Sequence, residues 1–514
     1  MPRAHRIALD GLSLTLDDLA PCLRGDPVRL ALTAGAKANV KRARRVVDDH
    51  VKAGDVVYGL TTGFGKLKSV AIASDQLEEL QRNLILSHAC GSGEPMPIGE
   101  VRAAQVLRLN GLVRGHSGIR PRLADALVRL FNKGFVPVVP QQGSVGASGD
   151  LAPQAHMAAA YMGHGEAYVD GRRMGARAAL RKVDEEPIRL AAKEGLALIN
   201  GIEVMTATGA EVWHRAANLS KAADALAALT IEALFGSASP FDPRLAELKG
   251  QPGHARTSAN VLRCLAGSKV LASHADCDRV QDPYSLRCVP QIHGAFKAAL
   301  AHVGDVLAAE MNSVTDNPVL FPDTGEVISA GQFHGQPVSM ALDYLGLAMC
   351  TLANVSERRL EQLVNPDLSS LPAFLCPDPG TNSGFMIAQV AAAALASENK
   401  VHAHPASVDT VPTSANQEDH VSMGVTAARK ARTICANTER VLAIEYAAAC
   451  QARDFHAELR AGKGAHAAYT LYRGRVKPMK RDRYLKPDLD VAEELLTGGE
   501  LVRVVERAAG ALEA

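Results

Sequence analysis

The sequence has almost no net charge, because its 56 lysines and arginines nearly balance its 55 aspartates and glutamates and leave +1 over 514 residues. This balance excludes a global field of the kind that draws proteins onto nucleic acid or anionic membranes. The one local basic run, at 473–483, is broken by Pro478 and interrupted by Asp482, so we interpret it as a solvated segment. A small, uncharged or zwitterionic partner is expected, with neither nucleic acid nor membrane involved.

Long hydrophobic runs are also missing. The first residues carry Asp10, Asp17 and Asp18 where a secretory signal needs an apolar core. The alanine-rich stretch at 389–396 is too short to span a bilayer and is closely followed by Glu398 and Lys400. We therefore expect no signal peptide, no membrane span and a cytoplasmic protein.

Cysteine pairs with C-x-x-C spacing are absent as well. The nine cysteines are scattered, and an odd number cannot all pair within one chain, so reduced and mostly buried thiols are expected. Two groups superficially suggest metal sites, His402 with His404 and the acidic and cysteine-containing group at 274–278, but their spacings match no strong zinc or calcium pattern. No metal is assigned.

The sequence is rich in apolar residues at helical spacing. From about residue 204 onward, stretches rich in alanine, leucine and valine follow one another with few strand signals. The main expected helices are 204–235, 291–312, 336–363, 384–401 and 421–451. Many are apolar over most of their circumference, as helices buried on several sides are. This pattern predicts a mainly α fold with a long central helix bundle.

The part of the chain before residue 204 has a different character. It mixes shorter helical stretches with glycine-rich turns at 58–65, 90–97 and 143–153, and such turns often carry function. We find no repeat, low-complexity tail or linker. We predict a smaller N-terminal domain of helices and glycine-rich loops at 1–203 and a long-helix bundle domain at 204–514.

The glycine-rich run QGSVGASGDLAP at 142–153 has three interpretations. A dinucleotide loop needs G-x-G-x-x-G between a strand and a helix, but these glycines stand at 143, 146 and 149, and prolines interrupt the preceding apolar run. A hydrolase nucleophile turn needs G-x-S-x-G, whereas the residues around Ser148 read G-A-S-G-D. Neither spacing is right.

The third interpretation is autocatalytic cyclisation of Ala147, Ser148 and Gly149. The amide nitrogen of Gly149 attacks the carbonyl carbon of Ala147, whose oxygen leaves as one water molecule, and loss of a second water from the Ser148 side chain leaves an exocyclic methylidene. The product is a 4-methylidene-imidazol-5-one. Glycine gives its nitrogen an unhindered approach, serine supplies the hydroxyl that leaves, and alanine is small. Alone this tripeptide is a common turn, so its neighbours must decide.

The neighbouring motifs carry a resemblance. The run GSVGASGDLAPQAHMA at 143–158 closely resembles the prosthetic-group segment of the histidine, phenylalanine and tyrosine ammonia-lyases and their aminomutase relatives. Further matching segments are YGLTTGFG at 58–65, LALING at 196–201, QDPYSLRC at 281–288, EMNSVTDNP at 310–318, NSGFMIAQ at 382–389 and SANQEDHVSMG at 414–424. The resemblance covers nearly the whole chain, and it implies the methylidene-imidazolone group with no external cofactor.

Two segments resemble the histidine enzymes of this family. Ser87 and His88 stand where the phenylalanine enzymes have Phe-Leu and the tyrosine enzymes often have His-Leu. The run NQEDH at 416–420 stands where the phenylalanine enzymes have a segment similar to H-N-Q-D-V. An imidazole offers one donor and one acceptor at neutral pH, so His88 and Glu418 can hold it, whereas a phenyl ring leaves both unpaired. Elimination of ammonia from L-histidine to give trans-urocanate is expected.

The same resemblance implies roles for the residues that remove the proton and hold the amine. Tyr58 is expected to act as a phenolate that takes the β-proton, while the substrate's amine adds to the methylidene; addition to the imidazole ring stays open. Asn200 and Tyr284 are expected to surround the prosthetic group and the departing amine. Glu418 is expected to position the imidazole or to assist proton transfer.

Three further residues are expected to bind the substrate by resemblance. Arg287 binds the carboxylate through its two-pronged guanidinium, and Gln281 supports that end. Phe333 packs on the electrophile or the ring, although core packing is the more common role of a lone phenylalanine. The resemblance also implies a homotetramer whose active sites are shared between subunits.

The chain departs from many histidine enzymes at three positions. Thr61 stands where asparagine is frequent, Ile202 where threonine is usual, and Gln332 where asparagine is frequent. Ile202 cannot donate the hydrogen bond of a threonine, so we expect weakened or retuned activity. An ammonia-lyase or a 2,3-aminomutase acting on tyrosine or phenylalanine, and a non-catalytic homologue, remain as alternatives.

Overall fold

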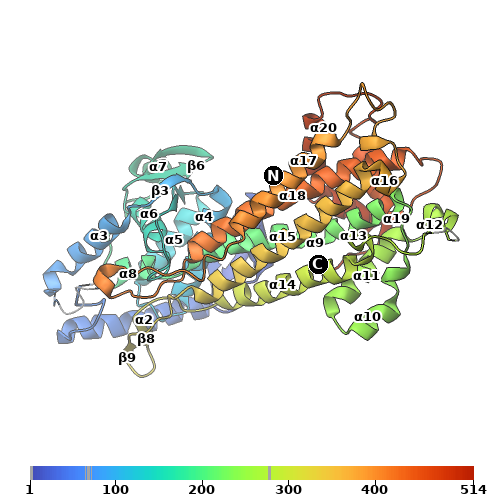
Figure 1. The fold of residues 1–514 in the computed structure, drawn as a ribbon. Coiled ribbons are helices and arrows are strands. Elements are labelled where there is room, and N and C mark those ends of the chain that lie inside the picture. Colours follow the sequence, from blue (N-terminus) through green and yellow to red (C-terminus); the bar gives the residue numbers. More distant parts are fainter. Residues whose placement is uncertain (1–3, 64, 66–69, 71, 276–278) are drawn as a thin grey trace. The chain divides into compact units, whose positions relative to one another are not determined.

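The computed structural model describes residues 4–63, 65, 70, 72–275 and 279–514 (Figure 1). The chain divides into two compact units. The first comprises Met1–Glu211, Gly304–Asp343 and Pro405–Arg429, and the second comprises Val212–Val303, Tyr344–His404 and Lys430–Ala514. Helices dominate both units, so the predicted mainly α class with long central helices is confirmed. The predicted domain boundary after residue 203 stays a prediction.

The shorter helices of the first unit precede residue 200. They are α1 (Leu16–Arg24), α2 (Ala34–Ala53), α3 (Leu77–His88), α4 (Ile98–Val113), α5 (Pro121–Asn132), α6 (Leu151–Tyr161), α7 (Ala176–Lys182) and α8 (Glu194–Ile199). Helix α1 begins at a capping box in which Thr15 and Asp18 satisfy each other's backbone amides. Helix α4 is buried over almost its whole length and packs against α1 and α5.

This unit also contains small β-sheets, which no clear sequence pattern predicts. Strands β1 (His5–Leu9) and β2 (Val28–Leu32) pair in parallel, β3 (Ser92–Pro95) pairs with β5 (Pro140–Gln142), and β8 (Val319–Phe321) pairs with β9 (Glu326–Ile328). A three-stranded antiparallel sheet has the order β4 (Val136–Pro137), β6 (Glu166–Val169), β7 (Arg172–Gly175). Each strand has five residues or fewer, which is too short for a clear alternating pattern.

The packing of three helices brings distant parts of the sequence together. Helices α3, α6 and α8 pack pairwise on one another in the first unit. His88 is the last residue of α3, Asp150 is the residue just before α6, and Asn200 follows α8. The ends of these helices therefore bring together segments that carry candidate site residues.

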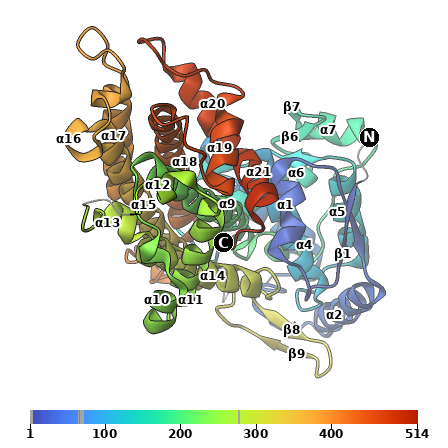
Figure 2. The ribbon, with the colours of Figure 1, turned by 90° about the vertical axis from the view of Figure 1, so that its right-hand side faces the viewer.

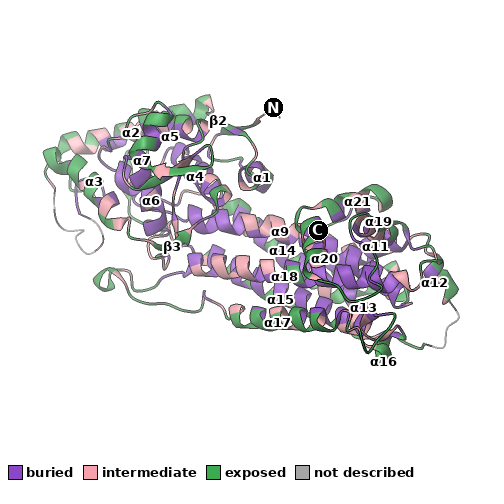
Figure 3. Cartoon of the chain, turned by 90° about the horizontal axis from the view of Figure 1, so that it is seen from above, coloured by how far each residue is buried: buried purple, intermediate pink, exposed green. Residues whose placement is uncertain are grey.

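The long helices are the ones that the apolar spacing predicts. They are α9 (Glu203–Ala233), α14 (Val289–Glu310), α15 (Gln336–Val364), α17 (Met386–His402) and α18 (Gly424–Asp454). The largest difference from a predicted end is three residues, at α18, which runs from 424 to 454 against the predicted 421 to 451. In the second unit α17 lies alongside α15 (Figures 1 and 2). Helix α9 is almost entirely buried there, whereas α17 is largely exposed (Figure 3).

The remaining helices of the second unit are short. They are α10 (Pro243–Lys249), α11 (Pro252–Leu265), α12 (Lys269–Ser273), α13 (Tyr284–Arg287), α16 (Pro366–Ser369), α19 (Lys463–Arg473), α20 (Lys486–Thr497) and α21 (Glu500–Ala509). Buried ion pairs join the long helices of this unit. Arg359 of α15 pairs with Glu445 of α18 at 2.5 Å, and Asp224 of α9 contacts His293 and Lys297 of α14 at 2.7 and 3.1 Å. Each charge has a partner, as burial requires.

Other expectations concern membranes, thiols and metals. Of the described helices, α15 is long and apolar enough to cross a membrane, but 67% of its most apolar window is buried inside the structure, as in the core helix of a globular unit. The eight described cysteines are thiols outside any disulfide, and five of them are buried. Within the described ranges no three metal-binding side chains cluster; residues 276–278, part of a group considered above, lie outside those ranges.

Candidate active site

A cavity of about 970 Å³ opens in the first unit. It is lined by six of the residues singled out in the sequence: Tyr58, His88, Ser148, Asn200, Phe333 and Glu418. They come from three separate stretches of the chain, each belonging to this unit. A concave pocket that gathers several titratable groups is where chemistry is expected.

The tripeptide of the glycine-rich segment lies at this cavity, with Ser148 in its wall. The Ser148 hydroxyl donates to Glu418 Oε1 at 3.0 Å. Gly149 has φ +77, a left-handed conformation that favours glycine, and a Cβ at this position would lie 2.1 Å from the carbonyl oxygen of Gly201. The Asp150 amide donates to that same oxygen at 2.6 Å. Only glycine can occupy position 149, and its backbone nitrogen is left unhindered by any side chain of its own.

Glu418 is held by a tight loop. Thr413 Oγ1 and Ser414 Oγ both donate to Glu418 Oε2 at 2.8 Å. The main chains of Thr413 and Glu418 also hydrogen-bond to each other in both directions. One carboxylate oxygen is therefore fixed by two hydroxyls, while the other meets Ser148.

Tyr58 lines the cavity with a partly buried phenol. Burial raises the pKa of Tyr58, the amide of Gly65 acts in the opposite direction by donating to its oxygen at 3.4 Å, and the negative charges of Glu418 and Asp316 raise it further. Within this chain the tyrosine is therefore a neutral phenol at pH 7. Its deprotonation requires alkaline pH or an added positive charge.

His88 ends helix α3 and faces the same cavity. Its Nδ1 lies 3.0 Å from the Ser87 hydroxyl. Burial lowers the pKa of His88, while a hydrogen bond with the carbonyl of Leu84 and the charge of Glu418 act in the opposite direction. The imidazole is neutral at pH 7, so one of its nitrogens can donate and the other can accept.

Only the amide nitrogen of the Asn200 side chain has hydrogen-bond partners among the described residues. Its Nδ2 donates to the carbonyl of Asn317 at 3.0 Å and to Asp316 Oδ1 at 3.4 Å. Asp316 in turn pairs with the fully buried Lys193 at 2.6 Å. Asn200 Oδ1 is buried and has no hydrogen-bond partner among the residues that the structure describes. An unpaired acceptor in the wall of a cavity is suited to a bound N–H donor.

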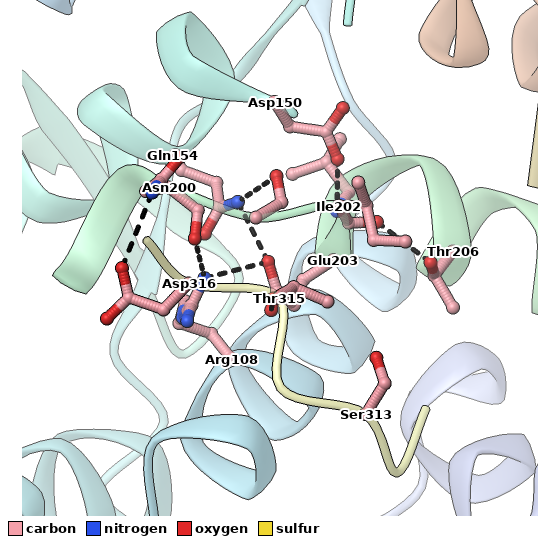
Figure 4. Close-up of polar contacts among 12 residues, drawn as sticks. Arg108, Asp150, Gln154, Asn200, Ile202, Glu203, Thr206, Ser313, Thr315 and Asp316 are labelled. Carbon is pink, nitrogen blue, oxygen red and sulfur yellow. Dashed lines mark hydrogen bonds and ion pairs between the residues drawn. The ribbon is translucent and has the colours of Figure 1, made fainter. Parts of the chain in front are cut away.

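A buried polar network lies behind this wall and was not found in the sequence (Figure 4). Glu203 Oε2 accepts from Arg108 at 3.0 Å and from Gln154 at 2.9 Å, and Glu203 Oε1 accepts from Thr315 at 2.7 Å. Gln154 also donates to the carbonyl of Gly201 at 2.8 Å. The network fixes the backbone against which the tripeptide rests. Its only sequence signal is the presence of charged residues within otherwise apolar helices.

The departure at Ile202 has a structural counterpart. Ile202 directly precedes α9 and has no side-chain oxygen with which to cap it. Asp150 supplies the acceptor instead: its Oδ2 receives the amides of Val204 and Met205 at 2.8 and 2.9 Å. Burial is the main reason that the pKa of Asp150 is raised to about 8. A neutral Asp150 therefore joins the tripeptide to the start of α9.

The departure at Thr61 has a local role. Its hydroxyl donates to the carbonyl of Asp55 at 2.6 Å and accepts the amide of Val57 at 2.9 Å, which closes the turn that carries Tyr58. Gln332 is exposed and directly precedes Phe333. Thr61 thus stabilises the backbone turn that positions Tyr58. Nothing in the structure explains the departure at Gln332.

Three predicted site residues belong to the second unit. Gln281, Tyr284 and Arg287 line a cavity of about 470 Å³ there, and none of them is among the described residues that line the first cavity. The Arg287 guanidinium lies 4.5 Å from the centre of the Tyr284 ring, and its Nε donates to the carbonyl of Asp282 at 3.0 Å. Tyr284 is 69% exposed, so its ring is available to another molecule.

Known proteins resemble the chain over its full length. The sequence pattern of the aromatic amino acid lyase family matches residues 14–474. The chain is 52% identical to a histidine ammonia-lyase of Symbiobacterium thermophilum over 98% of this chain and 99% of that protein, and 50% identical to one of Gloeobacter violaceus over 99% of both.

Solved structures agree with these relatives. A histidine ammonia-lyase from Trypanosoma cruzi superposes with a TM-score of 0.91 at 41% identity, covering 98% of this chain and 96% of that one. A tyrosine aminomutase from Streptomyces globisporus superposes with a TM-score of 0.93 at 34% identity, and both chains are fully covered. Sequence pattern, full-length relatives and fold converge, and the chain belongs to the aromatic amino acid lyase family.

Proposed function

We propose that this chain is a histidine ammonia-lyase, which breaks the bond between the α-carbon and the amine of L-histidine and gives trans-urocanate and ammonia. The observation that carries the proposal is the presence of His88 and Glu418 in one cavity with Ser148. Full-length relatives at about half identity are histidine ammonia-lyases, which supports the same substrate.

Ala147, Ser148 and Gly149 would form the methylidene-imidazolone group of this enzyme. The local geometry suits that chemistry, because position 149 admits only glycine and its neighbour Asp150 is tied to Gly201 and α9. When formed, the group supplies an electrophile that turns the substrate's amine into a leaving group. No external cofactor and no metal ion is part of this proposal.

Tyr58 would remove the β-proton of the substrate. Its phenol lines the cavity, and only its ionised form can accept that proton. Because burial raises the pKa of Tyr58, a nearby cation would assist the reaction by stabilising the phenolate. The unpaired Asn200 Oδ1 would accept a hydrogen bond from the substrate's ammonium group before the C–N bond breaks.

The imidazole of the substrate would lie between polar partners. A neutral imidazole can donate to a Glu418 oxygen and accept from or donate to His88, whose own ring is neutral. A phenyl ring in the same place would leave both groups without partners, and each such loss costs about 1–3 kcal/mol or more for a charged group. Phe333 would pack on the bound ring.

The carboxylate end of the substrate would be bound by a second subunit. Arg287, Gln281 and Tyr284 have the chemistry that this end requires, and they lie in the second unit of the chain. We propose a cytoplasmic homotetramer in which they complete the cavity of a neighbouring subunit. Large apolar side chains that are exposed on the long helices support such burial: Met340, Tyr344, Leu347, Met386, Ile387 and Val390.

The test is incubation of the purified protein with L-histidine, L-tyrosine and L-phenylalanine in separate reactions. Ultraviolet absorbance follows the conjugated acrylate, a second assay follows ammonia, and intact mass shows whether two water molecules have been lost. We expect urocanate and ammonia from histidine alone. A β-amino acid product from tyrosine or phenylalanine would establish an aminomutase instead. An unmodified mass together with no turnover would establish a non-catalytic homologue.

A further inference from the structure

The loop at 413–418, here called the Glu418 loop, has an unusual backbone. Ser414, Ala415 and Asn416 have φ values of 49, 52 and 66, so three consecutive residues with side chains are left-handed. This region disfavours residues with a Cβ atom, and such conformations persist where the surroundings determine them. Here the main-chain bonds between Thr413 and Glu418 close the loop, at 2.9 and 3.3 Å.

The effect of this backbone is to turn two hydroxyls onto one atom. Thr413, the first residue of the loop, and Ser414, the second, each donate to Glu418 Oε2 at 2.8 Å. The other oxygen, Oε1, accepts a hydrogen bond from the Ser148 hydroxyl at 3.0 Å. The two oxygens of one carboxylate are thus held by different parts of the first unit.

Cyclisation of the tripeptide would change the hydrogen bonds of the two Glu418 oxygens differently. Loss of water from Ser148 removes the hydroxyl that Oε1 accepts, whereas the hydroxyls of Thr413 and Ser414 remain on Oε2. Glu418 would then be presented to the cavity through a single oxygen whose direction is already fixed. A glutamate without these donors has freely rotating side-chain bonds and must lose that freedom when substrate binds.

We propose that Thr413 and Ser414 are positioning residues, which hold Glu418 Oε2 so that Oε1 alone meets the imidazole of the substrate. This inference rests on the proposed function, because it concerns the same cavity and the same substrate ring. It adds to that function a pair of hydroxyls that act through Glu418, although Ser414 also lines the cavity.

The experiment compares single and double variants of these hydroxyls in two backgrounds. Thr413→Val and Ser414→Ala each remove one hydroxyl donor. Thr413→Ser is the conservative variant that keeps the donor at position 413. Hydrogen bonds from a hydroxyl to a carboxylate contribute enough that we expect kcat for histidine to fall about tenfold for each lost donor. In a Glu418→Ala background the same substitutions should change kcat by less than about twofold, because no side-chain oxygen remains for them to orient.

Two controls separate orientation from stability. Thr410→Val removes a hydroxyl of the same segment that accepts the amide of Val421 and does not contact Glu418, so its kcat should stay close to that of the parent protein. Intact mass should show that every variant has lost the same two water molecules. Equal losses of kcat in the Glu418 and Glu418→Ala backgrounds, or full activity of the Thr413→Val Ser414→Ala protein, would overturn the inference. A parent protein that releases no ammonia from histidine would instead refute the proposed function, and the inference with it.

Discussion

The buried carboxyl of Asp150 makes the stability of the protein depend on pH in an unusual direction. Its pKa is raised from 3.8 to about 8 by burial, so between these values the folded chain holds a proton that the unfolded chain has lost. For such a group the free energy of unfolding decreases as pH rises, by about 1.4 kcal/mol per pH unit. From pH 5 to pH 8 the loss amounts to roughly 3–4 kcal/mol.

Asp150→Asn removes this titration while retaining the geometry. The amide oxygen can still accept from Val204 and Met205, as the neutral acid does through Oδ2. The difference in stability between the two proteins should therefore change with pH in favour of the variant by roughly 3–4 kcal/mol from pH 5 to pH 8, because all other groups titrate alike in both. Asp150→Ala, which removes the acceptor, should be less stable than Asp150→Asn at every pH by about 1 kcal/mol or more.

The measurement is urea unfolding of the three proteins at several values between pH 5 and pH 8. Parallel curves for the parent protein and Asp150→Asn would show that Asp150 is already ionised at pH 5 in the folded chain. That result would refute the reasoning from burial. It would mean that Arg108, whose charge acts to lower the pKa of Asp150, outweighs the loss of hydration.

Three further predictions concern the cavity. Ser148→Ala should fold with a normal circular dichroism spectrum, retain the mass of the unmodified chain and lose nearly all activity; full activity would contradict the proposed mechanism. Tyr58→Phe should abolish the rise of kcat with alkaline pH that the raised pKa of Tyr58 predicts, and a variant with an unchanged pH profile would exclude Tyr58 as the base. His88→Leu should reduce kcat/KM for histidine by about tenfold or more while affecting phenylalanine less, and equal losses would remove His88 from substrate selection.

Much of the fold could be predicted because it depends on a strong periodic signal. Helices α9, α14, α15, α17 and α18 are long and apolar, so their spacing defines them to within a few residues. The paired strands near the N-terminus left no comparable signal, since each is too short to show an alternating pattern. The family could be predicted because several motifs occur in the same order along the whole chain, and the comparisons confirm it.

The candidate site could be predicted only as a set of residues. Their roles stay predictions, although six of them line one cavity. Sequence spacing does not reveal that Thr413 and Ser414 bind Glu418, because the loop requires left-handed residues that no local pattern predicts. Sequence spacing also does not reveal that Asp150 caps α9 in place of a side-chain oxygen at position 202, since Asp150 reaches the first amides of that helix only through tertiary packing.

The distance along the chain between Ser148 and Glu418 has a consequence for biosynthesis. These residues hydrogen-bond across a separation of 270 positions. A ribosome adds about 5–20 residues per second, so roughly 14 to 54 s pass between the synthesis of one and of the other. Throughout that interval the nascent chain can fold only an incomplete first unit, because 405–429 has not yet emerged. The part of the cavity wall that contains Glu418 is therefore synthesised late. Until translation is more than four-fifths complete, Ser148 lacks its carboxylate partner in the growing chain.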